Sequence, residues 1–217
     1  MIGMYCAILL VATSPALSGE IHWNTIDKAD SAECATCAIQ YPSFPMLRSG
    51  SCNDSISQFV NETIESFRLK VRDANALFEN VPNRPFSELT IHTDSAYVSD
   101  SLVSCTMSVY LYTVGAAHGF QDYRSFVYDR IKGRMLRPSE FLLTRVDTLR
   151  RLIMDNLAAR GIRYDKRLLQ KTPVDSIHIS ICGSGILVSF ADYQIASYAC
   201  GPGQIVFGWQ SIKVTRR

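Results

Sequence analysis

The chain of 217 residues lacks the sequence motifs that most often mark a catalytic or metal site. It has no His-Glu-x-x-His, no His-x-His, no EF-hand loop and no Gly-x-Ser-x-Gly turn of a serine hydrolase. Cys34 and Cys37 form a Cys-x-x-Cys pair, but zinc would need two more ligands and no second pair exists. We therefore expect no catalytic set, no metal and no cofactor.

An excess of charge of one sign is also missing. The formal net charge is +2, charged residues make up 19% of the chain, and no basic run is longer than two residues, as at Arg216-Arg217. Nothing in this balance favours a nucleic acid partner. The apolar content of 47% is enough for a core and argues against wholesale disorder.

The N-terminus is free of charge from Met1 to Gly19 and is continuously apolar from Ile8 to Ala12. Small residues before the Ser18–Gly19 bond fit a signal peptidase site, so we predict a signal peptide at 1–18. The apolar run is shorter than the roughly 20 residues of a membrane span. One feature disagrees, because no Lys or Arg precedes Lys28; a buried N-terminal segment is the alternative. The expected protein is periplasmic or secreted, without a transmembrane anchor.

The cysteines fit an exported protein, because an even number remains after Cys6 leaves with the leader. We favour a disulfide between Cys182 and Cys200, which bracket two predicted strands, and one between Cys52 and either Cys34 or Cys37. Other pairings remain open. The candidate disulfide cysteines are Cys34, Cys37, Cys52, Cys105, Cys182 and Cys200.

Hydrophobic periodicity predicts two main helices. The first is capped by Asn53-Asp54, and its apolar residues recur at spacings of three and four. The second spans Asp147 to Arg160, with Gly161 in the left-handed position that ends a helix. The apolar stripe of the first helix consists of Ile56, Phe59, Val60, Ile64, Phe67, Val71, Ala74 and Phe78.

Alternating residues predict strands, and the segment 19–51 is expected to be irregular. In the second strand Val103, Cys105 and Met107 alternate with Ser104 and Thr106, so one face should be buried and the other partly wet. The order of elements predicts an α+β fold, with a largely antiparallel sheet packed against two main helices. Residues 19–217 would form one domain, or two subdomains of about 19–145 and 146–217. The expected strands are Leu89–Tyr97, Ser101–Val114, Arg124–Tyr128, Ser176–Ile181, Ile186–Phe190, Tyr193–Tyr198 and Gln204–Gly208.

The segment from Tyr110 to Leu142 holds the most distinctive pattern, a Gly-Ala-Ala-His-Gly turn between two strands. His118 lies in this turn, either bracing it or exposed to a ligand. Tyrosines cluster on or beside the strands, and tyrosine-rich surfaces are common in interfaces. The candidate binding surface is Tyr112, Gly115, His118, Gly119, Tyr123, Tyr193 and Tyr198. An alternative is a hydrolase that uses His118 with Asp122 or Asp129.

Three blocks of the chain together resemble the RsiV/PdaC-type extracytoplasmic domains of unknown function. The first is Tyr41-Pro42 with the helix at Asn53, the second runs from Tyr112 to Phe141, and the third from Gly185 to Ile205. Ala116 stands where the family commonly has a second glycine, and the extra cysteines are not part of its pattern.

The resemblance implies a stand-alone copy of an exported module that in anti-sigma members binds lysozyme and elsewhere accompanies cell-wall enzymes. Neither an anti-sigma segment nor a deacetylase domain is recognisable in the sequence. We therefore expect a non-catalytic cell-envelope protein that contacts a lysozyme-like hydrolase or peptidoglycan.

Overall fold

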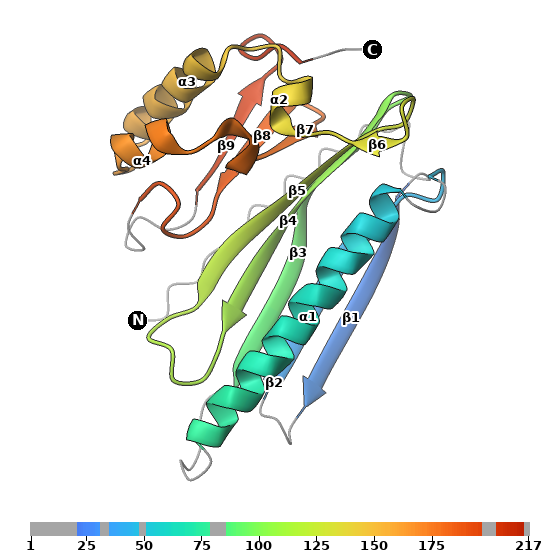
Figure 1. The fold of residues 1–217 in the computed structure, drawn as a ribbon, viewed down its shortest axis with the longest axis vertical. Coiled ribbons are helices and arrows are strands. Elements are labelled where there is room, and N and C mark those ends of the chain that lie inside the picture. Colours follow the sequence, from blue (N-terminus) through green and yellow to red (C-terminus); the bar gives the residue numbers. More distant parts are fainter. Residues whose placement is uncertain (1–20, 31–34, 48–50, 79–85, 197–202, 215–217) are drawn as a thin grey trace.

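The computed structural model describes residues 21–30, 35–47, 51–78, 86–196 and 203–214. Within these residues, six strands form one sheet in the order β1-β2-β3-β4-β5-β6, and three strands form a second sheet in the order β7-β8-β9. Only the β2–β3 pair of the larger sheet is parallel. The predicted α+β class with a largely antiparallel sheet is confirmed, and Figure 1 shows the small sheet and its helices above the larger one.

Two strands occupy the segment that the sequence predicts to be irregular, so that prediction is wrong. β1 (His22–Asp30) pairs with β2 (Ala35–Ser43), and β2 pairs with β3 (Ser87–Val98). Proline lacks the amide hydrogen that a ladder needs, which made Pro42 look incompatible with a strand. Pro42 in fact lies one residue from the end of β2, opposite Trp23 of the edge strand β1.

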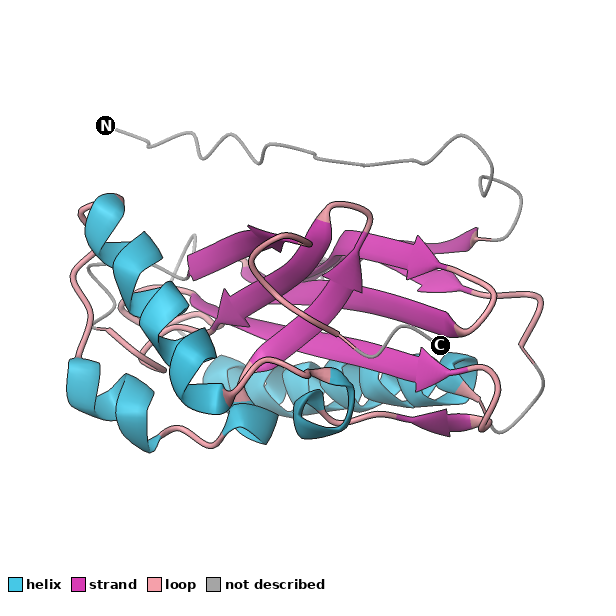
Figure 2. Ribbon diagram, turned by 90° about the horizontal axis from the view of Figure 1, so that it is seen from above, coloured by secondary structure: helices cyan, strands magenta, loops and turns pink. Residues whose placement is uncertain are grey.

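The long helix α1 (Cys52–Leu77) confirms the predicted apolar stripe. Ile56, Val60, Phe67 and Val71 are each at most 1% exposed, and they pack on the sheet. The predicted cap is corrected: Ser51 is the N-cap and accepts from the amide of Asn53. Along the outer side of the strands, α1 runs as a separate layer (Figure 2).

The centre of the large sheet is β3, β4 (Leu102–Tyr112) and β5 (Phe120–Asp129), which continues into the short β6 (Arg134–Met135). Apolar residues of β4, such as Cys105 and Met107, face α1 and are fully buried. Ser104 and Thr106 alternate with them and are also 0% exposed. The face expected to be partly wet is therefore buried along this part of β4.

The second sheet covers that polar face. It consists of β7 (His178–Cys182), β8 (Gly185–Phe190) and β9 (Gly203–Gly208). Thr106 donates to the hydroxyl of Ser180 at 2.6 Å and lies 2.9 Å from that of Ser125. Ser104 accepts from the amide of Ile181 at 2.9 Å. A layer of hydroxyl groups thus joins the two sheets, and the apolar cores lie on either side of it.

Helices complete the C-terminal half: α2 (Pro138–Phe141), α3 (Val146–Ala159), α4 (Lys166–Lys171) and a 3-10 turn at Val174–Ser176. The second predicted helix is confirmed as α3, and Gly161 follows it with a φ of 67°. A strand at Tyr193–Tyr198 is wrong for 193–196, which form a turn followed by a bend, and 197–198 lie outside the described residues.

The remaining predictions on processing fall mostly outside the described part. The signal peptide at 1–18 and the cysteines Cys34 and Cys200 lie there, and no described residue tests export. Cys37, Cys52, Cys105 and Cys182 are free thiols in the structure, so the disulfides stay predictions. None of the described helices has both the length and the apolar character for a membrane crossing.

Candidate functional site

The Gly-Ala-Ala-His-Gly turn links β4 to β5 and is shaped by close contacts at its two ends. Gly115 has a φ of 88°, and a Cβ there would lie 2.3 Å from the Phe78 ring. A Cβ on Gly119 would lie 2.3 Å from the Tyr110 ring. The turn needs glycine at both positions, because neither ring leaves room for a side chain.

His118 is the exposed centre of this turn, and both of its ring nitrogens have partners. Nδ1 lies 2.8 Å from the carbonyl oxygen of Gly119, which can only accept. The proton of the neutral ring is therefore on Nδ1, and Nε2 accepts from the hydroxyl of Tyr193 at 3.1 Å. The two rings lie with their centroids 6.3 Å apart.

Asp192 attaches the segment that carries Tyr193 to the beginning of β5. Its amide donates to the carbonyl of Gln121 at 2.9 Å, and its Oδ2 accepts from the amide of Gln121 at 2.7 Å. These two bonds make a short bridge on the outer edge of β5. Residues 75 positions apart, His118 and Tyr193, are thereby held together.

The backbone of Tyr193 is strained. Its φ is 64°, a left-handed value that costs a bulky residue about 1–3 kcal/mol. The side chain is nonetheless 52% exposed, so little burial offsets this cost. A strained and exposed aromatic residue is typical of a contact site.

Beside Tyr193 lies an open cavity of about 770 Å³. Arg163, Lys166 and Arg167 line it, are exposed, and form no ion pair with any described residue. The carboxylate of Asp165 accepts instead from two amides at the start of α4. The cavity is therefore positive and partly aromatic; its lining residues are Arg163, Tyr164, Asp165, Lys166, Arg167, Leu168, Tyr193 and Ala196.

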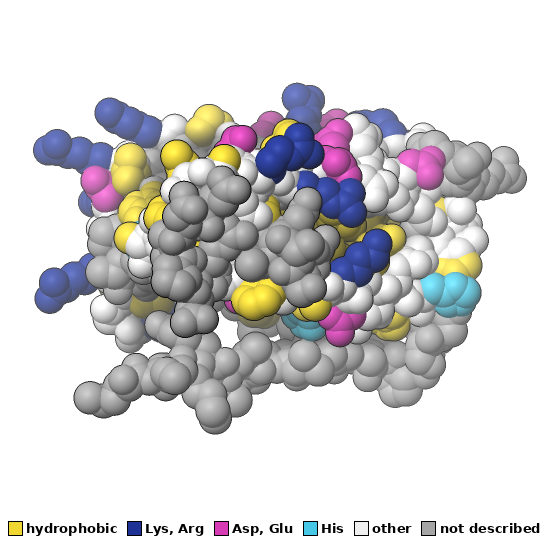
Figure 3. Space-filling view, turned by 90° about the horizontal axis from the view of Figure 1, so that it is seen from below, with side chains coloured by type: hydrophobic (Ala, Val, Ile, Leu, Met, Phe, Trp, Pro, Cys, Tyr) yellow, Lys and Arg dark blue, Asp and Glu magenta, His cyan; other side chains and the backbone are white. Residues whose placement is uncertain are grey.

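Arg163, Lys166 and Arg167 are all exposed to solvent. In the view of Figure 3, Lys and Arg side chains stand out from one end of the molecule next to hydrophobic ones. The amide of Asp165 donates to the carbonyl of Ile195 at 2.7 Å, which ties the start of α4 to the segment after Tyr193. The His118 turn, Tyr193 and the cations of α4 thus form a connected surface, which we call the turn–α4 surface.

The structure places the predicted binding residues in different environments. His118 and Tyr193 are exposed and in contact, Gly115 is exposed, and Tyr112 is half-buried at the end of β4. Gly119 is buried. Tyr123 is a correction, because it is only 7% exposed and faces the second sheet; burial, with Asp94 and Asp192 nearby, raises the pKa of its hydroxyl. Tyr198 lies outside the described residues.

The structure places both carboxylates of the hydrolase alternative in other contacts. Asp122 lies 3.8 Å from Nε2 of His178 and accepts from the amide of Tyr123. Asp129 is at the far end of β5, where its Oδ1 accepts from the amides of Ile131 and Lys132.

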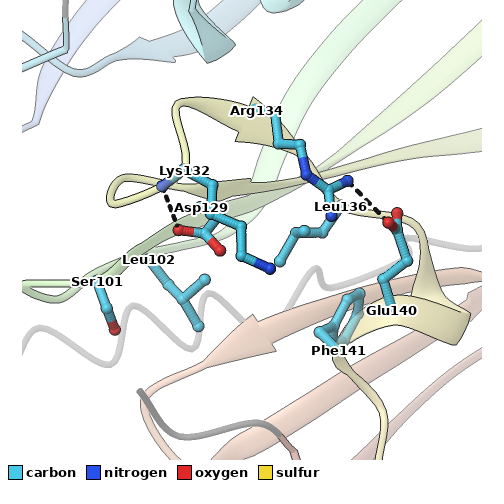
Figure 4. Close-up of a pocket in the computed structure, with 8 residues that line it drawn as sticks. All are labelled: Ser101, Leu102, Asp129, Lys132, Arg134, Leu136, Glu140 and Phe141. Carbon is cyan, nitrogen blue, oxygen red and sulfur yellow. Dashed lines mark hydrogen bonds and ion pairs between the residues drawn. The ribbon is translucent and has the colours of Figure 1, made fainter.

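Figure 4 shows Asp129 in a shallow pocket of about 70 Å³ near the Arg134–Glu140 ion pair. The amide of Arg137 and the bond from Arg134 lower the pKa of Glu140 to about 2. This pocket lies at a turn whose backbone is held by hydrogen bonds to Asp129. The turn is at the opposite end of β5 from His118.

Sequence reasoning missed the cations of the turn–α4 surface. Arg163 and the Lys166-Arg167 pair lie within five residues and make no basic run longer than two, so composition gave no signal. The Tyr164-Asp165 pair before Lys166 does have the form of a helix start, with Asp165 as the N-cap. In the part of the chain that the structure describes, no group of three or more His, Cys, Asp or Glu could hold a metal ion.

Comparison with known proteins gives the fold a family context. Residues 28–121 match the family model described as deacetylase PdaC. A DUF3298 family protein from Pseudomonas aeruginosa PAO1 is 16% identical with a TM-score of 0.53, covering 90% of this chain and 94% of its own. The fold is that of DUF3298 proteins.

A second solved structure, a member of the same family from Bacteroides fragilis, is 17% identical with a TM-score of 0.57 and the same coverage of both chains. The curated proteins contain no significant match. Of the resemblance to RsiV/PdaC-type domains, the PdaC part is supported for residues 28–121, and the DUF3298 likeness extends the shared fold over nearly the whole chain.

Proposed function

We propose that this protein is a non-catalytic binding module of the cell envelope, and that its ligand is peptidoglycan. The observation that carries the proposal is the open, positive and aromatic cavity of about 770 Å³ on the turn–α4 surface. The match to a family model described as a deacetylase of the PdaC type is consistent with a cell-wall setting.

The chemistry of the cavity fits a glycan with peptide side chains. Lys and Arg bind carboxylates, which the peptides of peptidoglycan carry. Tyrosine offers an apolar ring face with a polar edge, which suits a sugar ring. Because the hydroxyl of Tyr193 bonds to His118, the ring of Tyr193 is the part that would contact the glycan.

A lysozyme-like hydrolase is the other partner that the resemblance implies. The three cations of the cavity would repel a cationic protein, so only a hydrolase with an acidic face would fit this surface. Peptidoglycan has no such requirement, and we therefore favour it.

Sedimentation with purified, insoluble peptidoglycan tests the proposal. We expect the protein to sediment with the polymer, and the double variant Lys166→Gln/Arg167→Gln to lose most of this binding. Lys70→Gln/Arg72→Gln is the matched control, since it removes the same charge from two exposed residues of α1. Equal losses in both variants would mean nonspecific charge attraction and would contradict the proposal.

The aromatic part needs a separate pair of variants. Tyr193→Phe keeps the ring and should bind peptidoglycan almost as well as the unmodified protein, whereas Tyr193→Leu should bind more weakly. Calorimetry with a panel of lysozymes provides the second arm. A saturable complex with a lysozyme, without peptidoglycan binding, would assign the protein to the hydrolase-binding class and overturn our choice of ligand.

A further inference from the structure

A second surface, away from the turn–α4 surface, lies along the outer edge of β5. β6 pairs only with Tyr128 and Asp129 of this strand, and the amide of Leu136 adds a bond to the carbonyl of Val127. At the beginning of β5, Asp192 forms hydrogen bonds with the backbone N–H and C=O groups of Gln121. The middle of the edge has no neighbouring strand in the described part of the chain.

The direction of the backbone groups follows from these bonds. In an antiparallel pair, alternate residues direct both their N–H and C=O groups to the same neighbour. The backbone groups of Gln121 and Val127 form hydrogen bonds on the side away from β4. The backbone N–H and C=O groups of the odd-numbered residues of β5 therefore point away from β4. Ser125 is therefore an outward residue, and its backbone N–H and C=O have no hydrogen-bond partner among the described residues.

A groove of about 490 Å³ gives access to this edge. Its first wall belongs to the α1 side of the sheet and includes Ser55, Arg124 and Phe126; its second wall includes Ile177 and Ile179 from the C-terminal half. Because the groove straddles the edge of the sheet, a strand placed in it would direct alternate side chains to the two walls.

The two walls differ in the chemistry that they offer. The guanidinium of Arg124 lies 5.9 Å from the ring centroids of both Phe59 and Phe126, and it forms no ion pair with a described residue. On the opposite wall Ile177 and Ile179 are only 2% and 1% exposed, so its accessible groups include those of Ser176 and His178. Asp175 lines the groove as well, but both of its carboxylate oxygens accept from Ser139.

We propose that the β5 edge is a docking site for an extended segment of a partner protein, in which every second residue is acidic. The segment adds a strand beside β5 through the N–H and C=O groups of Ser125. Its acidic side chains face Arg124, and the side chains between them lie over Ser176 and His178. This site is independent of the peptidoglycan proposal, which rests on other residues.

Hydrogen exchange of the free protein is the first test. The amide of Ser125 should exchange rapidly, while that of Phe126, which faces β4, should be protected. A protected Ser125 amide would mean that the edge is already covered, and it would overturn the proposal. If the protection disappears on dilution, the occupant of the edge is a second copy of this chain. That result would also overturn the proposal of a partner segment.

The second test uses a synthetic peptide of three Val-Asp repeats with blocked ends. Its addition should shift the NMR amide signal of Ser125 and slow the exchange of that amide. The same peptide with N-methyl groups on alternate residues cannot pair and should have no effect, and a Val-Lys version should bind more weakly. Equal effects of all three peptides would contradict strand addition.

A pair of charge variants tests the role of Arg124. Arg124→Glu should weaken binding of the Val-Asp peptide about two- to fivefold, given the usual strength of an exposed ion pair. Arg72→Glu is the matched control, because Arg72 is exposed on α1 and does not line the groove. The same weakening in both would indicate that only net charge matters, and the proposed register would be wrong.

Discussion

At the scale of single residues, Gly115 and Gly161 both have a left-handed backbone. A comparison of the two distinguishes the effect of a steric clash from that of backbone strain. Gly115 has a φ of 88° and faces the Phe78 ring, whereas Gly161 has a φ of 67° and a Cβ added to it would meet nothing within 4 Å. Alanine at either position incurs the strain of the left-handed backbone, but only at Gly115 does it also displace a ring.

We expect Gly161→Ala to lower the free energy of unfolding by about 1 kcal/mol and Gly115→Ala by about 2–4 kcal/mol. Urea unfolding followed by circular dichroism measures both values. If the two variants were equally stable, Phe78 would have moved away at little cost, and the shape of the His118 turn would not depend on it.

The titration of His178 gives a prediction for pH. Burial lowers its pKa from the ordinary value of 6.5, and this effect exceeds the opposing one of Asp122. The unfolded chain therefore binds a proton at a higher pH than the folded protein does, and stability falls as the pH drops from about 6.5 toward the folded pKa.

His178→Gln removes this contribution. Between pH 7 and pH 5 the variant should lose less stability than the unmodified protein, as measured by denaturant unfolding at each pH. Other titrating groups, such as Asp94, are common to both proteins and cancel in the difference. Parallel pH profiles would show that His178 has the same pKa in the folded and unfolded states.

At the scale of secondary structure elements, α1 depends on a side-chain clamp at its start. Asn53 Oδ1 accepts from the amide of Phe44 at 2.8 Å, and its Nδ2 donates to the carbonyl of Phe44 at 2.9 Å. Phe44 is fully buried, so loss of the clamp leaves its amide without a partner, while its carbonyl keeps the bond from the amide of Leu47 at 3.0 Å.

Asn53→Ala should therefore lower the free energy of unfolding by about 1–3 kcal/mol. Asn61→Ala is the matched control, since Asn61 is exposed in the middle of the same helix, where alanine is the better helix former. The control should be neutral or slightly more stable in the same urea titration. A similar loss in both would assign the effect to the helix as a whole rather than to the clamp.

The elements also show where sequence reasoning succeeds. The stripe from Ile56 to Ala74 predicts α1 because its spacing is a local property of the chain. The strand at 35–43 was missed because Pro42 obscured it and its pairing with β3 is nonlocal. The contact between His118 and Tyr193 could not be predicted either, since it depends on Asp192 bonding to a strand 71 residues away.

At the scale of the whole molecule, the hydroxyl layer raises the question of whether the two halves unfold together. The sequence predicts either one domain or subdomains of about 19–145 and 146–217. The halves share Thr106–Ser180 and Ser104–Ile181 hydrogen bonds, and Val127 of β5 belongs to the core of the C-terminal half. Separating them would expose buried hydroxyl groups and part of that core.

The two tryptophans offer a reporter in each half: Trp23 in β1, and Trp209 next to β9, where its indole donates to the carbonyl of Gly183. We expect Trp23→Phe and Trp209→Phe variants to have one unfolding transition by fluorescence, each coincident with the transition by circular dichroism. Thr106→Val should lower both fluorescence midpoints together, because the lost hydroxyl serves both halves at once. Two separate midpoints, with only one sensitive to Thr106→Val, would instead show that the halves unfold independently and that the boundary near residue 145 divides real subdomains.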